Sequence, residues 1–207
     1  ELNYKISSKK NKPAHLILNL NPSASNGNAE DYHLAITPDN IRIEASSEAG
    51  LFYGLQTMLQ LLVDTNGAKM AGQIPCLTIT DAPAQAWRGM MLDESRQFFG
   101  TQTVKQMLDW MAYYKLNKFH WHLTDSPGWR IEIKKYPKLT QVGGKGCETD
   151  RRPNAPALFY TQEQIRGIVA YAKQRAITII PEIDMPGHAD AAVAAYPELD
   201  GGGYKSK

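Results

Sequence analysis

Three short runs of branched and aromatic residues in this chain each end in charged or polar side chains. They lie within Trp87–Phe99, Phe119–Asp125 and Ile180–His188, and the segments between them carry helical periodicity. Alternating strands and helices predict parallel strands, because a parallel pair needs a long crossover connection, which is usually a helix. The carboxyl ends of such strands meet at one rim, where (β/α) barrels hold their reactive groups. The pattern therefore predicts an α/β fold whose polar strand ends converge.

The individual elements after Pro83 follow this alternation. We predict strands at 88–94, 118–125 and 176–184, with a longer loop that contains proline and glycine running to about residue 160. Thr161 and Gln164 form a capping-box pattern at the start of the second helix. The apolar faces of the two predicted helices comprise Val104, Met107, Leu108 and Met111, and then Ile165, Ile168, Val169 and Ala172.

The turn after the first of these strands distinguishes two parallel architectures. A doubly wound sheet that binds dinucleotides carries a glycine-rich phosphate loop at this point, whereas this chain has Ser95–Phe99. We therefore predict the N-terminal part of a TIM (β/α)8 barrel, with about three βα units, over residues 85–207.

The segment before the predicted barrel has a different organisation. Short runs at 15–20, 33–37 and 40–45, separated by turn residues, predict antiparallel strands, and a further strand is expected at 76–80. A helix is predicted from Glu48 to a stop at Asn66-Gly67, with an apolar face that comprises Leu51, Leu55, Met58, Leu59 and Leu62. These elements predict a small α+β domain over residues 1–84, with one long helix on a sheet.

The charge and cysteine content narrow the expected partners. The 23 basic and 21 acidic residues give a formal net charge of +2, which produces no field for nucleic acid or an anionic membrane surface. No apolar run approaches the roughly 20 residues that span a bilayer. Cys76 and Cys147 lack metal-ligand spacing, and we expect one buried thiol and one loop thiol. The expected partner is a small neutral molecule, with no nucleic acid and no membrane.

Arg96, Asp125 and His188 are the candidate site residues at the strand ends. A guanidinium after the first strand suits hydrogen bonding to vicinal hydroxyls, although an ion pair with Asp93 is an alternative. A carboxylate at position 125 can accept a proton from a hydroxyl or orient an imidazole, and an acid beside His188 would raise the pKa of that imidazole.

A metal site is a competing interpretation of the same strand ends. His120 and His122 form a His-x-His pair, and Asp125, Asp184 and His188 could complete a coordination shell. The period of two along a strand places both histidines on one face and Asp125 on the other, which argues against this site. A bulge near Thr124 would defeat the argument.

Four blocks in order resemble glycoside hydrolase family 20, the β-N-acetylhexosaminidases. They are Trp87–Arg96, Lys115–Asp125, Gly128–Ile131 and Pro181–His188, and the segment before them is similar to the family's small α+β domain with less specificity. The resemblance implies that Arg96 holds ring hydroxyls of the non-reducing N-acetylhexosamine. It also implies that Asp125 and His188 belong to a hydrogen-bonded relay that supports the acid/base.

The chain departs from the family at the catalytic pair. The family carries an Asp-Glu pair in a His-x-Gly-Gly-Asp-Glu block, which is absent here, and the only Asp-Glu dipeptide is Asp93-Glu94. In the family the substrate's acetamido oxygen attacks the anomeric carbon, the Asp orients it, and the Glu protonates the leaving oxygen. No catalytic residue is therefore assigned in this chain, and the 207-residue polypeptide alone is predicted to be inactive.

The resemblance implies an N-terminal portion of a retaining exo-β-N-acetylhexosaminidase that needs no cofactor or metal. It implies a glycan with terminal N-acetylhexosamine as the partner, and a secreted, periplasmic or lysosomal location. The alternatives are a carbohydrate-binding or interaction protein without catalysis, and a metal-dependent hydrolase. Because three parallel strands leave two open edges, we also expect the missing strands to come from a longer parent chain or from self-association.

Overall fold

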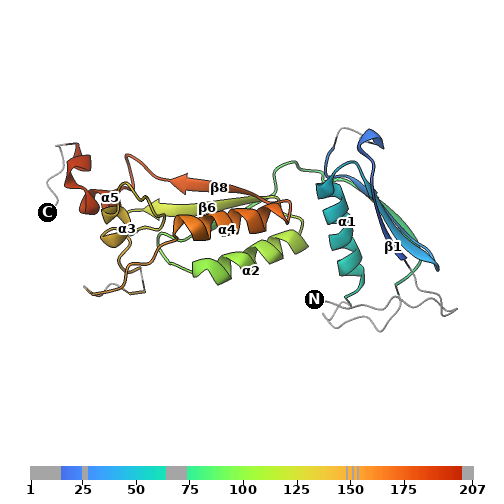
Figure 1. Cartoon of the computed structure of the whole chain (residues 1–207), viewed down its shortest axis with the longest axis horizontal. Helices are drawn as coiled ribbons and strands as arrows, with labels where there is room; N and C mark the ends of the chain where they lie inside the picture. The colour runs from blue at the N-terminus through green and yellow to red at the C-terminus, as the bar shows by residue number, and fades with distance from the viewer. Residues whose placement is uncertain are drawn as a thin grey trace. The chain divides into compact units, whose positions relative to one another are not determined.

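The computed structural model describes residues 15–24, 28–63, 74–147, 149–150, 152 and 154–201. The chain divides into two compact units, Glu1–Ala86 with Tyr113–Lys115, and Trp87–Ala112 with Leu116–Lys207. Each unit contains a sheet with helices packed against it (Figure 1). Within the described ranges, no helix combines the length and the apolar character needed to cross a membrane.

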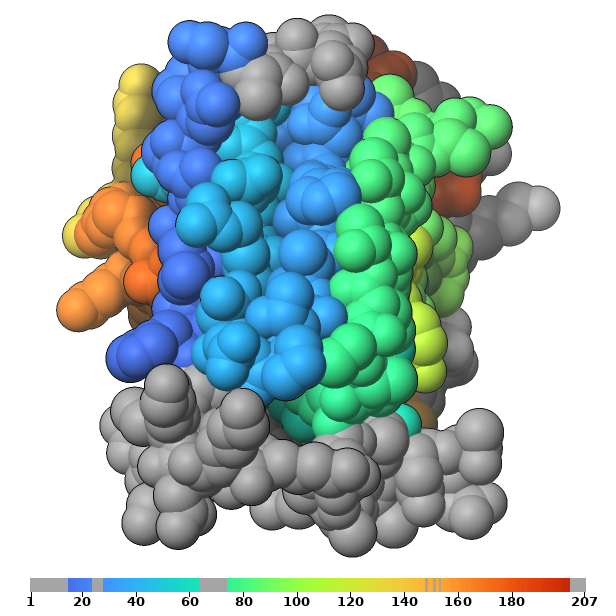
Figure 2. Space-filling view, turned by 90° about the vertical axis from the view of Figure 1, so that its right-hand side faces the viewer, coloured from blue at the N-terminus to red at the C-terminus, as the bar shows by residue number. Residues whose placement is uncertain are grey.

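The sheet of the first unit contains β1 (His15–Leu20), β2 (Tyr32–Ile36), β3 (Asn40–Ala45) and β4 (Leu77–Asp81). Their order is β1-β3-β2-β4, and Figure 2 shows the four strands side by side. A short 3-10 helix, η1 (Pro22–Ala24), follows β1. The prediction that all these strands are antiparallel is wrong for β1, which pairs with β3 in parallel. Strands β2 and β3 form an antiparallel hairpin. Strand β1 pairs with the β3 edge of this hairpin and not with β2, the strand that follows it in the chain, and it therefore runs parallel to β3.

Helix α1 (Glu48–Leu61) covers one face of this sheet, as the sequence predicts (Figure 1). Its buried face differs from the predicted leucine stripe, of which only Met58 is buried; the other buried positions are Gly50, Tyr53, Gly54 and Thr57. The two glycines explain the difference, because a Cβ at Gly50 would lie 2.2 Å from the Asp31 carbonyl oxygen and one at Gly54 2.5 Å from Ile43. The helix approaches the sheet most closely along this face. The predicted stop at Asn66-Gly67 lies outside the described residues.

The second unit contains the predicted parallel strands. Strands β5 (Gly89–Asp93), β6 (Lys118–Asp125) and β8 (Thr178–Ile183) lie in the order β5-β6-β8, and both pairings of β6 are parallel. The two-residue strand β7 (Gly128–Trp129) folds back antiparallel onto the end of β6. In Figure 1, β6 and β8 point toward the same end of the unit. The ends of the parallel strands thus meet, as the alternation of strands and helices predicts.

Helices α2 (Gly100–Tyr113) and α4 (Gln162–Lys173) lie along the same side of these strands (Figure 1). Asp109 of α2 accepts hydrogen bonds from Tyr171 and Arg175, which links the helices. The capping box of Thr161 and Gln164 is present. The buried positions include Val104, Leu108, Met111, Ile168 and Ala172, whereas Val169 is 46% exposed.

The remaining short elements surround the strand ends. Helix α3 (Lys138–Gln141) and strand β7 lie in the segment predicted as a long loop, and α5 (Asp190–Ala195) and η2 (Pro197–Asp200) follow β8. Trp129, Leu139 and three alanines of α5 form one buried apolar cluster. Cys76 is exposed and Cys147 is buried, and both thiols are free, which agrees with the predicted contrast.

Candidate functional site

The structure gathers the three predicted site residues around one carboxylate. Asp125 ends β6 and is buried, with 3% of its side chain exposed. Arg96 Nη2 lies 2.8 Å from Asp125 Oδ2, and His188 Nδ1 lies 2.9 Å from Asp125 Oδ1. Arg96 and His188 are far apart in sequence, and 46% and 66% of their side chains are exposed. A buried acceptor therefore holds two polar groups that face solvent at the strand-end rim.

Local backbone geometry places both partners of Asp125. After β5 the chain turns, and Asp93 Oδ1 accepts a hydrogen bond of 3.0 Å from the Arg96 backbone N–H. Arg96 also forms an ion pair with the Asp93 side chain, so the ion-pair alternative is present together with the Asp125 contact. His188 has a φ of 58°, in the left-handed region that non-glycine residues rarely adopt. Such strain is often found at ligand sites, where the surrounding structure enforces it.

A β-bulge in β6 overturns the parity argument that separated Asp125 from the histidines. His122 pairs with Glu182 and Thr124 pairs with Ile183, so β6 carries one extra residue between these pairs. The extra residue turns Asp125 toward the face of His122. His122 Nε2 consequently lies 3.1 Å from Asp125 Oδ2.

The Asp125 carboxyl group is ionised and contacts Arg96, His122 and His188. Burial by itself would raise the pKa of its carboxyl group. The Ser126 backbone N–H at 2.6 Å, the imidazoles of His122 and His188, and the Arg96 charge outweigh burial and hold the pKa below its usual value. The site therefore presents a carboxylate that stays ionised in mildly acidic solution.

Glu182 is a member of this network that the sequence did not identify as functional, and His122, which the sequence identified only as a candidate metal ligand, is another member. His122 has 6% of its side chain exposed, and its Nδ1 lies 2.8 Å from Glu182 Oε2, a charge contact outside the angles of a hydrogen bond. His120 also forms an ion pair with Glu182. The His-x-His alternation on a strand was the available signal, because it places two imidazoles on one face beside the next strand.

The acids at the end of β8 influence each other. Burial and the neighbouring Glu182 carboxyl group raise the pKa of Asp184. For Glu182, burial acts in the same direction, but the close contact with His122 and the charge of its imidazole dominate and lower the pKa of Glu182. This pair keeps negative charge beside His122 across neutral pH.

Some of the candidate metal ligands lie close together in the structure. His122, Asp125 and Asp184 each offer one atom within 4.8 Å of the others. His120 and His188 do not join this group among the residues that the structure describes. The Arg96 guanidinium already neutralises Asp125 Oδ2, where a metal ion's charge would act. The donor set therefore favours an ion-paired relay.

We predict that His122 titrates above its ordinary range. Burial would lower the pKa of its imidazole, but Glu182, Asp125 and the charge of Asp93 together raise it. Since the folded pKa exceeds the unfolded value of about 6.5, its stabilising charge is fully present below pH ~6.5 and is lost as pH rises through the folded pKa. NMR of ¹³C-histidine-labelled protein, with His122→Gln for assignment, measures the midpoint. A midpoint at or below about 6.5 would contradict this prediction.

The comparisons with known proteins agree on one family. The description "glycosyl hydrolase family 20, catalytic domain" matches residues 85–206, and "glycosyl hydrolase family 20, domain 2" matches residues 1–82. The β-hexosaminidase of Porphyromonas gingivalis is 49% identical over 174 residues, which cover 82% of this chain and 22% of the relative.

Solved structures of the same family are similar to this chain. The β-N-acetylhexosaminidase of Streptomyces coelicolor A3(2) is 39% identical with a TM-score of 0.79, over 89% of this chain and 37% of that chain. The exo-β-N-acetylglucosaminidase of Vibrio harveyi, solved with N-acetylglucosamine, is 41% identical with a TM-score of 0.75, over 88% and 29% of the two chains. The chain therefore spans between 22% and 37% of the length of these three relatives.

Proposed function

The chain belongs to glycoside hydrolase family 20, and from this premise we propose that it forms part of a β-N-acetylhexosaminidase. Such an enzyme removes terminal non-reducing N-acetylhexosamine residues from β-N-acetylhexosaminides. The observation that carries the proposal is the convergence of Arg96 and His188 on the buried Asp125 carboxylate. This arrangement fits a polar rim that binds a neutral sugar and supports proton transfer.

Each of the three residues has a proposed task. Arg96 donates to ring hydroxyls, because a half-exposed guanidinium fork can exchange part of its ion pairing for hydroxyl acceptors. Asp125 holds the Nδ1 side of the His188 imidazole, and the proposed task of Nε2 is to act on a third group. The acid and the acetamido-orienting carboxylate of substrate-assisted retaining catalysis are not among the residues of this chain.

We also propose the finer architecture. Residues 85–207 form the first part of a (β/α)8 barrel, and residues 1–84 form the small α+β domain. The parallel order β5-β6-β8, with α2 and α4 on one side of the strands, supports the barrel assignment. On the family resemblance alone, we propose a secreted, periplasmic or lysosomal location and no cofactor.

Replacing Arg96 tests the proposed sugar contact. In the enzyme that carries this chain at its native length, Arg96→Ala is expected to lose about 1.5 to 3 kcal/mol of transition-state stabilisation, or about 10- to 150-fold in kcat/KM. Steady-state kinetics on a chromogenic N-acetylglucosaminide measures the loss. Arg175→Ala is the matched control, since it removes an arginine from an aspartate pair between α2 and α4. Equal, small effects of both changes would favour a purely structural ion pair at Arg96.

The purified 207-residue chain is expected to self-associate through its second unit. Among the described residues, β5 and β8 are the outer strands of its parallel sheet. Met90 and Met91 are 40% and 52% exposed, and a cavity of about 370 Å³ with a largely apolar lining lies between β8 and α4. Open edges and uncovered apolar faces favour association.

Size-exclusion chromatography with light scattering and hydrogen exchange tests this expectation on the purified 207-residue chain. Dimers, aggregates or rapid exchange at Thr178–Ile183 are the expected result. A monodisperse monomer with strongly protected amides in β8 would contradict it.

A further inference from the structure

Arg130 is a fully buried arginine beside β7, with none of its surface exposed. A buried guanidinium is costly unless its N–H groups are hydrogen-bonded. Arg130 donates through Nε to the Glu94 carbonyl at 3.1 Å and through Nη2 to the Ser95 carbonyl at 2.8 Å. Its Nη1 donates to the carbonyls of Gly144 and Leu158 at 2.8 and 3.1 Å. One side chain therefore joins the turn after β5 to two points of the 143–160 segment.

The neighbouring residues make room for this guanidinium. A Cβ at Gly128 would lie 2.4 Å from Arg130 Nη2, so only glycine fits at that position without displacing the side chain. Ser95 Oγ donates to the Gly128 carbonyl at 2.7 Å, which adds a second contact between β7 and the turn after β5. Three hydrogen bonds therefore fix the turn: two from Arg130 to the carbonyls of Glu94 and Ser95, and one from the Ser95 hydroxyl to the Gly128 carbonyl.

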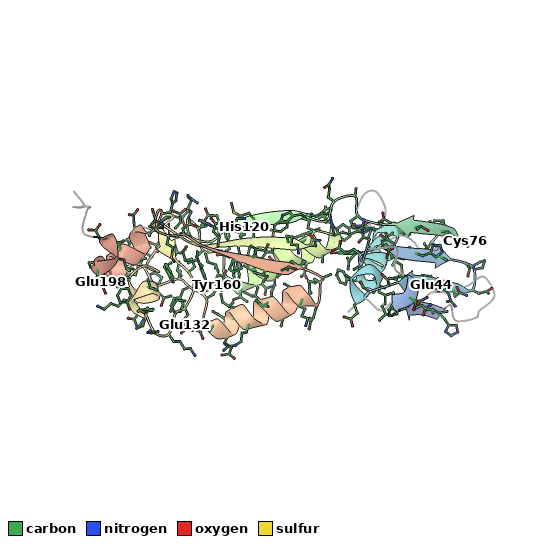
Figure 3. The ribbon with its side chains drawn as sticks, turned by 90° about the horizontal axis from the view of Figure 1, so that it is seen from above. Glu44, Cys76, His120, Glu132, Tyr160 and Glu198 are labelled. Atoms are coloured by element: carbon green, nitrogen blue, oxygen red, sulfur yellow. The ribbon has the colours of Figure 1, made fainter. Side chains whose placement is uncertain are left out.

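The Glu94 side chain forms a second buried attachment of the same turn. It is fully buried, and it accepts hydrogen bonds from Tyr160 Oη at 2.6 Å and from the Phe99 backbone N–H at 2.8 Å. Tyr160, labelled in Figure 3, packs its ring against Trp121 and Phe98 with centroid distances of 4.8 Å. Glu94 therefore points inward, while its neighbours Asp93 and Arg96 meet each other at the rim.

We propose that Arg130, Glu94 and Tyr160 are positioning residues that fix the Asp93–Arg96 turn and thereby direct the Arg96 guanidinium toward the sugar. The proposal rests on the sugar-binding task of Arg96 given above. The Arg130 contacts end on the two carbonyls immediately before Arg96, so a shift of this turn moves the whole Arg96 side chain. A displacement of about 1 Å in a positioned group can cost about 100-fold in rate.

A double-mutant cycle separates this role from general support of the fold. The enzyme at its native length is compared with Arg130→Lys, Arg96→Ala and the double variant, using a chromogenic N-acetylglucosaminide. Lysine keeps the charge of Arg130 but lacks the planar fork. We expect Arg130→Lys to raise KM by about 10-fold with a smaller change in kcat. In the Arg96→Ala background the same change should alter kcat/KM by less than about twofold.

Tyr160→Phe provides a milder second cycle if Arg130→Lys does not fold, because it removes only the hydroxyl and keeps the ring packing. Its effect on KM should also vanish in the Arg96→Ala background. Arg152→Lys is the matched control, because Arg152 pairs with Asp150 in an exposed contact and should leave both constants unchanged.

The outcomes distinguish the two levels of proposal. Additive losses in both cycles, with an active unmodified enzyme, would overturn the positioning role alone and leave the proposed function intact. An unmodified enzyme that hydrolyses no N-acetylhexosaminide would overturn the proposed function, and the positioning role with it. If Arg130→Lys and Tyr160→Phe no longer change KM in the Arg96→Ala background, the positioning role and the proposed function are both supported.

Discussion

The purified 207-residue chain is expected to leave a chromogenic β-N-acetylglucosaminide uncleaved. Its sequence lacks the His-x-Gly-Gly-Asp-Glu block that supplies the acid and the acetamido-orienting carboxylate in the family. General acid catalysis alone contributes about 10² to 10⁴ in rate, and correct orientation of an internal nucleophile contributes more. The proposed tasks of Arg96, Asp125 and His188 are to bind the sugar and to support the acid/base, and the family's catalytic pair is not among the residues of this chain.

The measurement is release of the chromophore by purified chain, with an active family 20 enzyme as the positive control. Turnover at an ordinary enzymatic rate, about 1 to 10³ per second, would show that other groups perform the chemistry. Mass spectrometry of the native gene product provides a second test. A product that ends at Lys207 would favour the non-catalytic carbohydrate-binding alternative, and one that continues into the missing block would favour the enzyme.

Asp125→Asn is expected to have the largest effect of any single substitution in the rim. The amide keeps the shape of the carboxyl group but removes the charge that faces Arg96, His122 and His188. His122 is the buried partner of Asp125, and removing one member of a buried ion pair costs about 3 to 5 kcal/mol because the remaining charge loses its compensation. The contacts with the more exposed Arg96 and His188 contribute less. In the enzyme at its native length, kcat should fall more than KM rises, because the proposed task of Asp125 is to support the acid/base.

Steady-state kinetics and thermal unfolding on the same samples separate the catalytic loss from a loss of stability. Asp109→Asn is the matched control, because this aspartate pairs with Arg175 while 52% of its side chain is exposed. Exposed pairs contribute about 0 to 1 kcal/mol. If Asp125→Asn changed activity no more than the control does, the rim would have no role in a relay.

Local sequence signals predicted much of the second unit. The alternation of large apolar residues with histidines indicated β6, and the structure has this strand at Lys118–Asp125 as expected. The Thr161 and Gln164 pattern indicated the start of α4, because a capping box satisfies N–H groups within one turn of helix. Arg96, Asp125 and His188 were recognised because each lies at or after the end of a strand, and parallel strands end at a common rim.

Other features arise only when distant segments pack together. The bulge in β6 brings Asp125 to His122. From the sequence, a bulge near Thr124 was an alternative that could not be decided, since a bulge depends on the register with β8. The direction of β1 likewise depended on which edge of the β2–β3 hairpin it joined. The buried face of α1 depended on where Gly50 and Gly54 let the helix approach the sheet.

The amino-acid sequence by itself determined the alternation of strands and helices, the bounds of β6, the start of α4, and the three polar residues at the rim, because these follow from periodicity and capping within a few residues. Only the tertiary structure decided that His122 and Glu182 join Asp125 in one charged network, and that Arg130 and Glu94 turn inward beneath Arg96. The Arg130–Glu94 and Glu94–Tyr160 contacts join residues 36 and 66 positions apart, and the His122–Glu182 contact joins two separate strands. The buried groups among them interact strongly because packing has removed the water around them.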